Sequence, residues 1–340
     1  MHLRDASGLL TCEMTHDMPQ GKPSINELPT LAIIIVTWKV RDLLRACLHA
    51  VQASLADSGL RYEVFVVDNA SHDGTPAMLR AAFPTVRLIE SGANLGFAGG
   101  NNLALRVVLR EGRARYVLLL NPDTVPVGDA LPRLVQALEA RPALAVVGPH
   151  LRYGDGTAQS SRRRFPTVAT LFWESTALAR LWPGNPWAQR YHCATHPDTE
   201  PQPVDWLVGA ALLVRVAAIR RAGLLDERFF MYSEELEWQQ RLQTAWGHAA
   251  VWYLPEAVIT HYEGKSSDQA VVQRQFNFDR SKLLLARMWY GWRVAGLLRA
   301  YLRLSFGYAS AVEALKWVLG HRRGLRRQRL GAYWQIMRGL

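Results

Sequence analysis

Short apolar runs alternate with segments of helical periodicity in the first half of the chain, and this alternation sets the class of fold. The apolar runs span residues 31–38, 63–69, 86–90, 116–120 and 144–148. The helical segments span residues 41–56, 73–83, 98–111 and 130–140. Strands that alternate with helices form βαβ units. The sequence therefore predicts an α/β protein with a mainly parallel central sheet and flanking helices.

Polar residues stand where three of the predicted strands end. They are Thr37 and Trp38 after the first strand, Asp68 after the second, and segment 121–123 after the fourth. In open α/β sheets, ligands bind beyond the carboxyl ends of the strands. We therefore expect these side chains to share one binding site.

The second half of the chain is less regular. Residues 152–203 are rich in Arg, Trp, Pro and Gly, which predicts long loops with short helices. Beyond them we expect a buried segment over 206–214, a helix over 233–245, short strands over 250–254 and 257–260, and helix from 274 onward. A chain of 340 residues can hold one large α/β domain with an appended segment.

The segment Asn121-Pro122-Asp123 follows a predicted buried strand directly. All three residues favour turns, so one interpretation is a simple turn. The other is a divalent-cation site, because Mg²⁺ and Mn²⁺ prefer oxygen ligands and share them with diphosphate oxygens. His261 also follows a predicted strand. A lone histidine is more often structural than metal-binding, so its neighbours decide its role.

Two further segments suit a nucleotide. Asp68 can accept hydrogen bonds from a base or ribose, or it can cap the following helix, a role that Ser71 or Asp73 can also fill. Residues 94–102 (NLGFAGGNN) open a predicted helix, where glycines permit close backbone approach and the helix N-terminus favours anions. This segment is neither G-x-G-x-x-G nor a Walker A motif, which disfavours a hydride-transferring or P-loop enzyme.

Three carboxylates, Glu234, Glu235 and Glu237, stand at the start of a predicted helix. On a regular helix Glu234 and Glu237 share a face, and Glu235 points away from it. The acids either form a solvated cluster that complements the helix dipole or supply a general base. Clustering supports the second interpretation, because neighbouring acids raise one another's pKa toward useful values.

Seven strings occur in order between residues 31 and 267: IIIVTW, VVDNASHDGT, NLGFAGGNN, LLLNPDT, VDWLVGAALLVR, LDERFFMYSEE and ITHYEGKSS. Together they resemble the family 2 inverting glycosyltransferases, especially bacterial rhamnosyltransferase-like members. The resemblance implies a GT-A fold, a nucleotide-diphosphate-sugar donor and an acceptor hydroxyl in cell-surface polysaccharide or glycolipid synthesis. It also implies a single displacement with inversion at the anomeric carbon.

The resemblance implies roles for residues on both substrates. The expected donor-binding residues are Thr37, Trp38, Asp68, Asn94, Gly96, Phe97, Asn102 and Asn121. Trp206 and Gly209 are expected on the acceptor side. The donor expected first is dTDP-rhamnose, and UDP-linked hexoses come next. The expected acceptor is lipid-linked or a polysaccharide.

The resemblance also implies a metal and a base. Asp123 stands at the second acid of the family's D-x-D motif and, with His261, would hold Mg²⁺ or Mn²⁺. Glu235 stands where the family has its catalytic base, and Glu234 is the alternative. Two positions depart from the family pattern. Asn121 replaces the first Asp of D-x-D, and Glu235 replaces the usual Asp, so the base carboxyl lies one methylene further out.

The last sixty residues carry the net charge of the chain: twelve Lys and Arg against one acid, Glu313. Four of these bases share one predicted helix face: Arg322, Arg323, Arg326 and Arg327. No apolar stretch is long enough to span a membrane. We expect this region to lie on an anionic membrane; a solvated helical pair is the alternative. Nucleic acid is not expected as a partner, because no nucleic-acid motif accompanies the charge.

The predicted organisation is a flexible lead over residues 1–29, a GT-A domain over 30–270 and a basic, aromatic-rich helical region over 271–340. Cys12, Cys47 and Cys193 are far apart, which suits a reducing cytoplasm better than a disulfide framework. The polar first thirty residues do not resemble a signal peptide. We therefore expect a cytoplasmic protein at the inner face of the cell membrane.

Two other functions stay open from the sequence. A nucleotidyltransferase on a similar sheet would release pyrophosphate in place of a nucleoside diphosphate. A degenerate nucleotide-sugar-binding or scaffold protein would bind the donor without turnover. Because Asn121 and Glu235 depart from the family pattern, this last alternative stays open.

Overall fold

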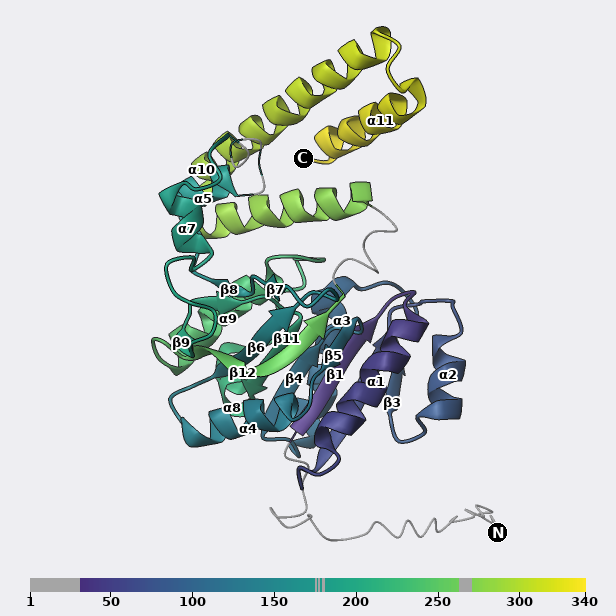
Figure 1. Ribbon diagram of the computed structural model, residues 1–340, viewed down its shortest axis with the longest axis vertical. Coiled ribbons are helices and arrows are strands. Elements are labelled where there is room, and N and C mark those ends of the chain that lie inside the picture. The colour runs from purple at the N-terminus through teal and green to yellow at the C-terminus, as the bar shows by residue number, and fades with distance from the viewer. Residues whose placement is uncertain (1–30, 175, 177, 179–180, 263–270) are drawn as a thin grey trace, which may run out of the picture.

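The computed structural model describes residues 31–174, 176, 178, 181–262 and 271–340. A ten-stranded sheet forms its centre, with strands in the order β3-β2-β1-β4-β11-β6-β12-β5 along the main path (Figure 1). The predicted lead over residues 1–29 and the last part of the seventh string, residues 263–267, lie outside the described residues.

Six strands of the main path run in one direction, and β11 and β5 run the other way. The path consists of β1 (Leu31–Thr37), β2 (Tyr62–Asp68), β3 (Arg87–Glu90), β4 (Tyr116–Leu120), β5 (Thr124–Pro126), β6 (Val146–Arg152), β11 (Ala211–Arg215) and β12 (Val251–His261). The short β7 (Ala158–Gln159) and β9 (Gln202–Pro203) extend this sheet, and β8 (Arg162–Arg163) pairs separately with β10 (Trp206–Leu207). The predicted mixed α/β architecture, with a mostly parallel sheet, is confirmed.

Helices cover both faces of the sheet because successive strand residues point to opposite sides. Leu31, Ile33 and Ile35 pack with α1 (Arg41–Leu55), α2 (Thr75–Ala82) and α4 (Ala130–Ala140). Ala32 and Ile34 pack with α3 (Gly96–Glu111), α8 (Val216–Ala222) and α9 (Glu234–Trp246) on the other face. The continuous apolar runs of the sequence are thus explained by burial on two sides.

The C-terminal region is a separate helical layer above the carboxyl ends of the strands (Figure 1). It comprises α10 (Val271–Val318), which bends at Gly291 where φ is 83° and ψ is 176°, and α11 (Arg323–Gly339). The second half of α10 and α11 form a hairpin, and α5 (Val168–Trp173) and α7 (Pro186–Tyr191) lie at the bend of α10. In the part of the chain described, no helix combines the length and apolar character that crossing a bilayer requires.

Three expectations from the sequence need correction. The two short strands expected at 250–254 and 257–260 are one strand, β12, which continues through an irregularity between Leu254 and Val258. The sequence analysis did not predict β5 or α8. The predicted four-arginine face is incomplete, because Arg326 is buried and donates to Glu313 at 2.7 Å.

Candidate active site

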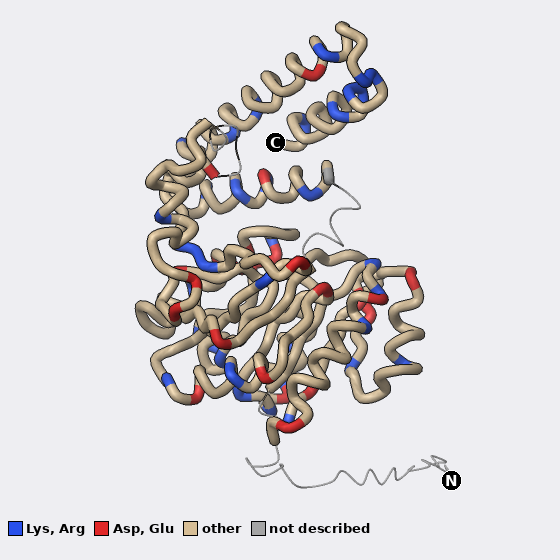
Figure 2. Tube along the Cα trace, in the orientation of Figure 1, with Lys and Arg blue, Asp and Glu red and all other residues tan. Residues whose placement is uncertain are grey.

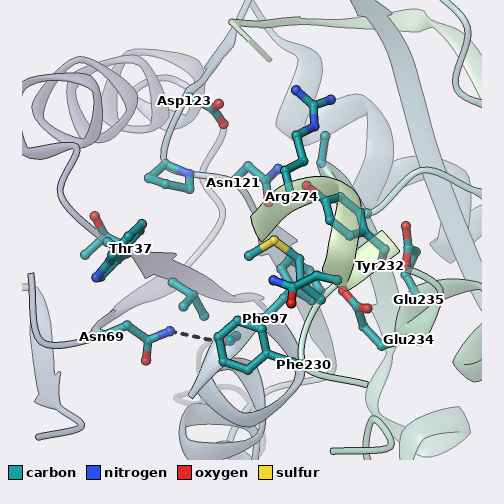
Figure 3. Close-up of a pocket in the computed structure, with 18 of the residues that line it drawn as sticks. Thr37, Asn69, Phe97, Asn121, Asp123, Phe230, Tyr232, Glu234, Glu235 and Arg274 are labelled. Carbon is teal, nitrogen blue, oxygen red and sulfur yellow. Dashed lines mark hydrogen bonds between the residues drawn. The ribbon is translucent and has the colours of Figure 1, made fainter. Parts of the chain in front are cut away.

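A cavity of about 510 Å³ opens at the carboxyl ends of the parallel strands. Its walls come from the ends of β1 and β4, the start of α3, the segment 208–210 before β11, the segment 230–235 that leads into α9, the end of β12, and the first turns of α10. Figure 3 shows Thr37 and Asn69 on one side of this cavity and Glu234 and Glu235 on the opposite side. Asp123 lies between these two groups in the upper part of the view, and Asn121 lies below it, nearer the centre.

Buried polar atoms without partners mark the side of the cavity formed by β1 and β2. Thr37 and Asp68 are paired in register at the ends of these strands. Thr37 Oγ1, one carboxylate oxygen of Asp68 and Asn69 Oδ1 are all buried and accept or donate no hydrogen bond. Buried polar groups are normally paired, so three orphaned atoms together indicate the place of a polar ligand. Thr37 and Asn69 line the cavity, whereas Asp68 does not.

The start of α3 closes the cavity by a close backbone contact. Gly96 has φ +69°, and a Cβ atom at this position would lie 2.0 Å from the carbonyl oxygen of Phe230. The N–H of Phe97 donates to that same oxygen at 2.9 Å. Asn69 Nδ2 donates to the carbonyl of Gly96 at 3.0 Å (Figure 3), and Asn94 Oδ1 accepts from its N–H. Glycine is therefore required at residue 96 for conformation and for space.

Asp123 and His261 lie together on the cavity wall, as the sequence predicts. His261 Nε2 is 3.3 Å from Asp123 Oδ1 and 3.4 Å from Asn121 Nδ2. The other ring nitrogen, Nδ1, is 3.0 Å from Gln159 Oε1. An amide oxygen accepts but does not donate, so this contact places a proton on Nδ1, and Nε2 is the ring nitrogen that faces Asp123.

The pairing of β5 with β12 brings these two residues together. His261 is opposite Thr124 in this antiparallel ladder, and the N–H of Tyr262 donates to the carbonyl of Asp123 at 2.9 Å. Residues 121–124 do form a turn, in which Thr124 Oγ1 donates to the carbonyl of Asn121 at 2.7 Å. The turn and the ligand interpretations of this segment are therefore compatible.

This pair suits a divalent cation. A carboxylate, and an imidazole whose other ring nitrogen is held by a hydrogen bond, are ordinary ligands for Mn²⁺. Among the described residues, three or more His, Cys, Asp or Glu side chains do not gather at any point that would hold a metal. Asp123 and His261 would hold such a cation together with oxygens of a bound substrate and water.

Glu234 and Glu235 lie at the opposite wall, at the start of α9. The backbone reaches them through Tyr232 and Ser233, which have φ values of 72° and 67°. Burial raises the pKa of Glu234 well above its ordinary value, and the charge of Glu235 adds to this rise. Burial also raises the pKa of Glu235, but backbone N–H groups, including that of Gly209, oppose the rise. Each carboxylate has one buried oxygen without a partner.

The expected grouping of the acids is reversed in the structure. Glu237 does not share the cavity with Glu234; it is buried and pairs with Arg241 at 2.7 Å. Glu235, expected to point away, lines the cavity beside Glu234. A Cβ atom at Gly209 would lie in ordinary contact with the Glu235 side chain, 3.4 Å from its Cβ and Cγ atoms, so the two residues are direct neighbours.

Most predicted site residues line the cavity, and three do not. Those that line it are Thr37, Trp38, Asn94, Gly96, Phe97, Gly209, Asn121, Asp123, Glu234, Glu235 and His261. Asn102 is buried, and its amide bonds to the backbone of Leu225 and to Glu227. Trp206 is also buried and donates to the carbonyl of Arg164 at 3.1 Å. The third is Asp68, whose free oxygen stands beside Thr37.

The structure adds wall residues that the sequence analysis did not propose. Asn69, Phe230 and Tyr232 belong to segments that the analysis had already quoted. Gln273, Arg274 and Asn277 come from the first turns of α10, and Figure 3 shows the Arg274 side chain extending near Asn121. A helical pattern alone gave no signal for these three, because only the fold brings the start of α10 over the sheet.

The family of the chain follows from comparison with known proteins. Residues 32–208 match the model of glycosyl transferase family 2. An N-acetylglucosaminyl-diphospho-decaprenol L-rhamnosyltransferase of Mycobacterium tuberculosis is 31% identical over 278 residues, which cover 78% of this chain and 87% of that protein. The chain belongs to glycosyl transferase family 2, and it is a glycosyltransferase.

Other similar proteins agree with this placement. Rhamnosyltransferase WbbL of Escherichia coli is 27% identical over 176 residues, 51% of this chain and 62% of that protein. The mannosyltransferase PcManGT of Pyrobaculum calidifontis, solved with GDP-Man and Mn²⁺, superposes with a TM-score of 0.50 at 15% identity, over 95% of this chain and 89% of its own. GalNAc-T7, solved with UDP, GalNAc and Mn²⁺, superposes with a TM-score of 0.51 at 12% identity, over 84% of this chain and 51% of its own. The predicted GT-A fold is confirmed.

Proposed function

We propose that this glycosyltransferase moves a sugar, with rhamnose the first candidate, from a nucleotide-diphosphate donor to a hydroxyl of a lipid-linked glycan. One observation carries the proposal. A single cavity has Asp123 and His261, a pair that suits a cation, on one wall, and the carboxyls of buried Glu234 and half-buried Glu235 on another. The mycobacterial relative, named for rhamnosyl transfer to a lipid-linked sugar, supports the choice of substrates.

The donor nucleoside is assigned to the wall with the orphaned polar atoms. Thr37 Oγ1, Asn69 Oδ1 and the free oxygen of Asp68 can each bond to the base or ribose. Their burial makes an unfilled site costly, because each buried polar group without a partner loses about 1–3 kcal/mol relative to a bonded one. A ligand that bonds to all three removes this cost. Asn102 is not part of this assignment, because its amide is already bonded to segment 225–227.

The donor diphosphate is assigned to the edge where Asp123 and His261 lie. Asp123 Oδ1 and His261 Nε2 would hold Mg²⁺ or Mn²⁺, and when bound the cation supplies positive charge to the leaving diphosphate. The Mn²⁺ in both similar structures supports this choice. Arg274 reaches the same edge from α10. Its guanidinium would contact the diphosphate, since a planar fork of donors matches phosphate oxygens.

Glu235 is assigned as the general base and Glu234 as its protonated neighbour. A base must be ionised before it can accept a proton. The backbone N–H groups around Glu235 favour its charged form, whereas Glu234 is more deeply buried and its pKa is raised further by the charge of Glu235. Two adjacent carboxyls oppose each other's ionisation, so we assign the single negative charge to Glu235, the better solvated of the two.

The reaction then needs one displacement. The acceptor oxygen forms a bond to the anomeric carbon while the bond from that carbon to the diphosphate oxygen breaks. The acceptor proton passes to Glu235, and the nucleoside diphosphate leaves. A single displacement inverts the anomeric configuration. A lipid-linked acceptor also places the enzyme at the membrane, and we assign it to the cytoplasmic face, as the sequence analysis expected.

A donor panel tests the proposal. Purified protein is incubated with dTDP-rhamnose, UDP-hexoses or GDP-mannose, with a polyprenyl-diphosphate-GlcNAc acceptor, and release of nucleoside diphosphate is measured. We expect turnover with one donor, loss of activity in EDTA and recovery with Mn²⁺ or Mg²⁺. Asp123→Ala should reduce turnover by about a hundredfold or more, since it removes a direct metal ligand.

The same panel separates the alternatives. Release of pyrophosphate would identify a nucleotidyltransferase. Donor binding without turnover, with any donor and either metal, would identify a binding protein and overturn the proposal. Activity unaffected by EDTA and by Asp123→Ala would remove the cation from the mechanism.

A further inference from the structure

The second half of α10 exposes a row of large apolar side chains. We name this row the α10 stripe, and it consists of Leu297, Leu304, Tyr308, Leu315 and Val318. Each of these residues is 61–74% exposed. Scattered exposed apolar residues are ordinary, but a contiguous row of this size marks an interaction surface.

The spacing of the stripe places it on one face of the helix. Successive members are 7, 4, 7 and 3 residues apart, which returns to nearly the same direction at 3.6 residues per turn. The row extends for about 30 Å at 1.5 Å per residue. Leu298 and Leu302, on a different face, are buried in the core that α10 shares with α5 and α11. The helix is therefore apolar on two faces, and the described residues of the chain cover only one of them.

The charge around the stripe has one sign. Arg293, Arg299 and Arg303 are exposed on the same half of α10. The single acid beyond residue 280, Glu313, is buried in ion pairs with Arg326 and Arg329. Figure 2 shows the Lys and Arg residues gathered around the end of the hairpin formed by α10 and α11. The surface around the stripe therefore offers cations and no exposed carboxylate.

Arginine and tryptophan occur in pairs in this region. The guanidinium of Arg293 lies 5.4 Å from the ring centre of Trp292, that of Arg323 lies 5.6 Å from Trp317, and that of Arg338 lies 4.6 Å from Trp334. All three Trp rings are among the exposed large side chains. Exposed aromatic rings with long cationic side chains suit the headgroup zone of a bilayer, where rings enter the acyl boundary and charges remain at the phosphates.

We propose that the α10 stripe docks on an anionic lipid bilayer, with its apolar side chains at the acyl boundary and the surrounding arginines on lipid phosphates. The proposal rests on the proposed function in that a lipid-linked acceptor requires the enzyme at a membrane. A second copy of the chain is the other candidate occupant. Self-association through this face would bring two cationic surfaces together, and the region exposes no acid to compensate them.

Docking through α10 connects the bilayer with the cavity. The first turns of the same helix contribute Gln273, Arg274 and Asn277 to the cavity wall. Ser281 Oγ donates to the carbonyl of Met231 at 2.8 Å, so this half of α10 is fixed to the segment that leads to the acids. A bilayer-bound stripe would hold the cavity at a set position relative to the lipid that carries the acceptor.

Vesicle binding tests the proposal without any sugar substrate. The full chain is mixed with vesicles of phosphatidylcholine alone or with 30% phosphatidylglycerol, and the bound fraction is measured by flotation at low and high salt. The stripe variant is Leu304→Ser/Tyr308→Ser/Leu315→Ser. The control is Val127→Ser, which removes a half-exposed apolar side chain from the catalytic domain. A charge variant, Arg293→Gln/Arg299→Gln/Arg303→Gln, separates electrostatic from apolar binding.

We expect wild type and the control to bind the anionic vesicles and to retain part of that binding at high salt, because salt screens only the charges. The stripe variant should bind at least tenfold more weakly than wild type at both salt concentrations. The charge variant should lose binding mainly at low salt. Equal binding of the stripe variant and wild type would overturn the proposal. So would a wild-type dimer that becomes a monomer in the stripe variant while neither protein binds vesicles, since the occupant would then be a second copy.

Transfer to a water-soluble acceptor keeps this test independent of the proposed function. The stripe variant should transfer sugar to a soluble acceptor at the wild-type rate, which also shows that it folds. If the stripe variant loses vesicle binding but keeps sugar transfer, the result supports the α10 stripe as the membrane-docking surface. If wild-type protein binds vesicles but transfers no sugar, the proposed membrane surface is supported and only the proposed glycosyl transfer is overturned.

Discussion

The cavity and the α10 stripe are opposite kinds of surface. Around the cavity, the apolar side chains are packed in the two sheet cores, while five buried polar atoms lack a partner. They belong to Thr37, Asp68, Asn69, Glu234 and Glu235. In the hairpin, the buried carboxylate of Glu313 is paired, while the large apolar side chains of the stripe face outward.

This contrast shows what each region needs from outside the chain. Unpaired buried polar atoms are costly until a polar ligand bonds to them, so the cavity calls for a hydrogen-bonding substrate. Exposing apolar area to water costs free energy, so burying the stripe in an apolar environment is favourable. Two hydroxyl groups in the helical region, those of Tyr301 and Ser310, are also buried without partners, but they do not line this cavity.

The strongest test of the contrast removes the base and leaves the stripe intact. Glu235→Gln keeps the shape of the side chain but cannot accept a proton, so turnover should fall by roughly 10²–10⁴-fold. Vesicle binding should not change. Nucleoside diphosphate release and flotation measure the two effects in the same preparation. Glu234→Gln is the matched control, and a larger loss in that variant would transfer the role of base to Glu234.

The next test concerns the close contact that closes the cavity. Gly96 and Gly92 both have positive φ, 69° and 74°, but only at Gly96 would a Cβ atom meet backbone. Gly92→Ala should lower the free energy of unfolding by about 1–2 kcal/mol through conformation alone. Gly96→Ala should cost roughly 3 kcal/mol or more, because the carbonyl of Phe230 must also move. Urea unfolding measures the difference, and equal losses in the two variants would contradict the contact.

The smallest expected effect is a gain in stability. Burial raises the pKa of Glu234 above its unfolded value of about 4.3, so ionisation destabilises the fold as pH rises from that value. Glu234→Gln cannot ionise, and it should melt a few degrees above wild type at pH 8, with the difference shrinking toward pH 4. Melting curves across this range measure it. Glu237→Gln, which loses the pair with Arg241, should melt lower than wild type.

The parallel half of the fold was predictable because its strands are apolar on both faces. Residues 31–38 were expected as a strand, and β1 spans Leu31–Thr37. The strand β12 was harder, since Pro255 and the irregularity after Leu254 break its pattern in the middle. Three-residue β5 gives no periodic signal at all, and its strand character depends on pairing with β12.

The site residues that directly follow strands could be predicted from the sequence. Those whose side-chain orientation depends on the tertiary structure could not. Asp123 was found from its place after a buried strand, and His261 only through the resemblance. The orientation of Glu235 was not predictable, because it depends on positive φ values at Tyr232 and Ser233. Arg274 was not found, because a helix start gives no indication that it lies over another part of the chain.

The antiparallel strand β11 also limits where insertions and deletions can be accommodated in this enzyme. The carbonyl of Ala210 accepts from the N–H of Asn121, and Ala211 pairs with Leu120, so the turn at residues 121–124 is joined to the Gly209 segment through one ladder. Leu213 lies in one sheet core, while its neighbours Leu212 and Val214 lie in the other. One inserted residue ahead of this strand would exchange all three between cores. The segment before β11 can therefore accept exchanged side chains more readily than a change of chain length.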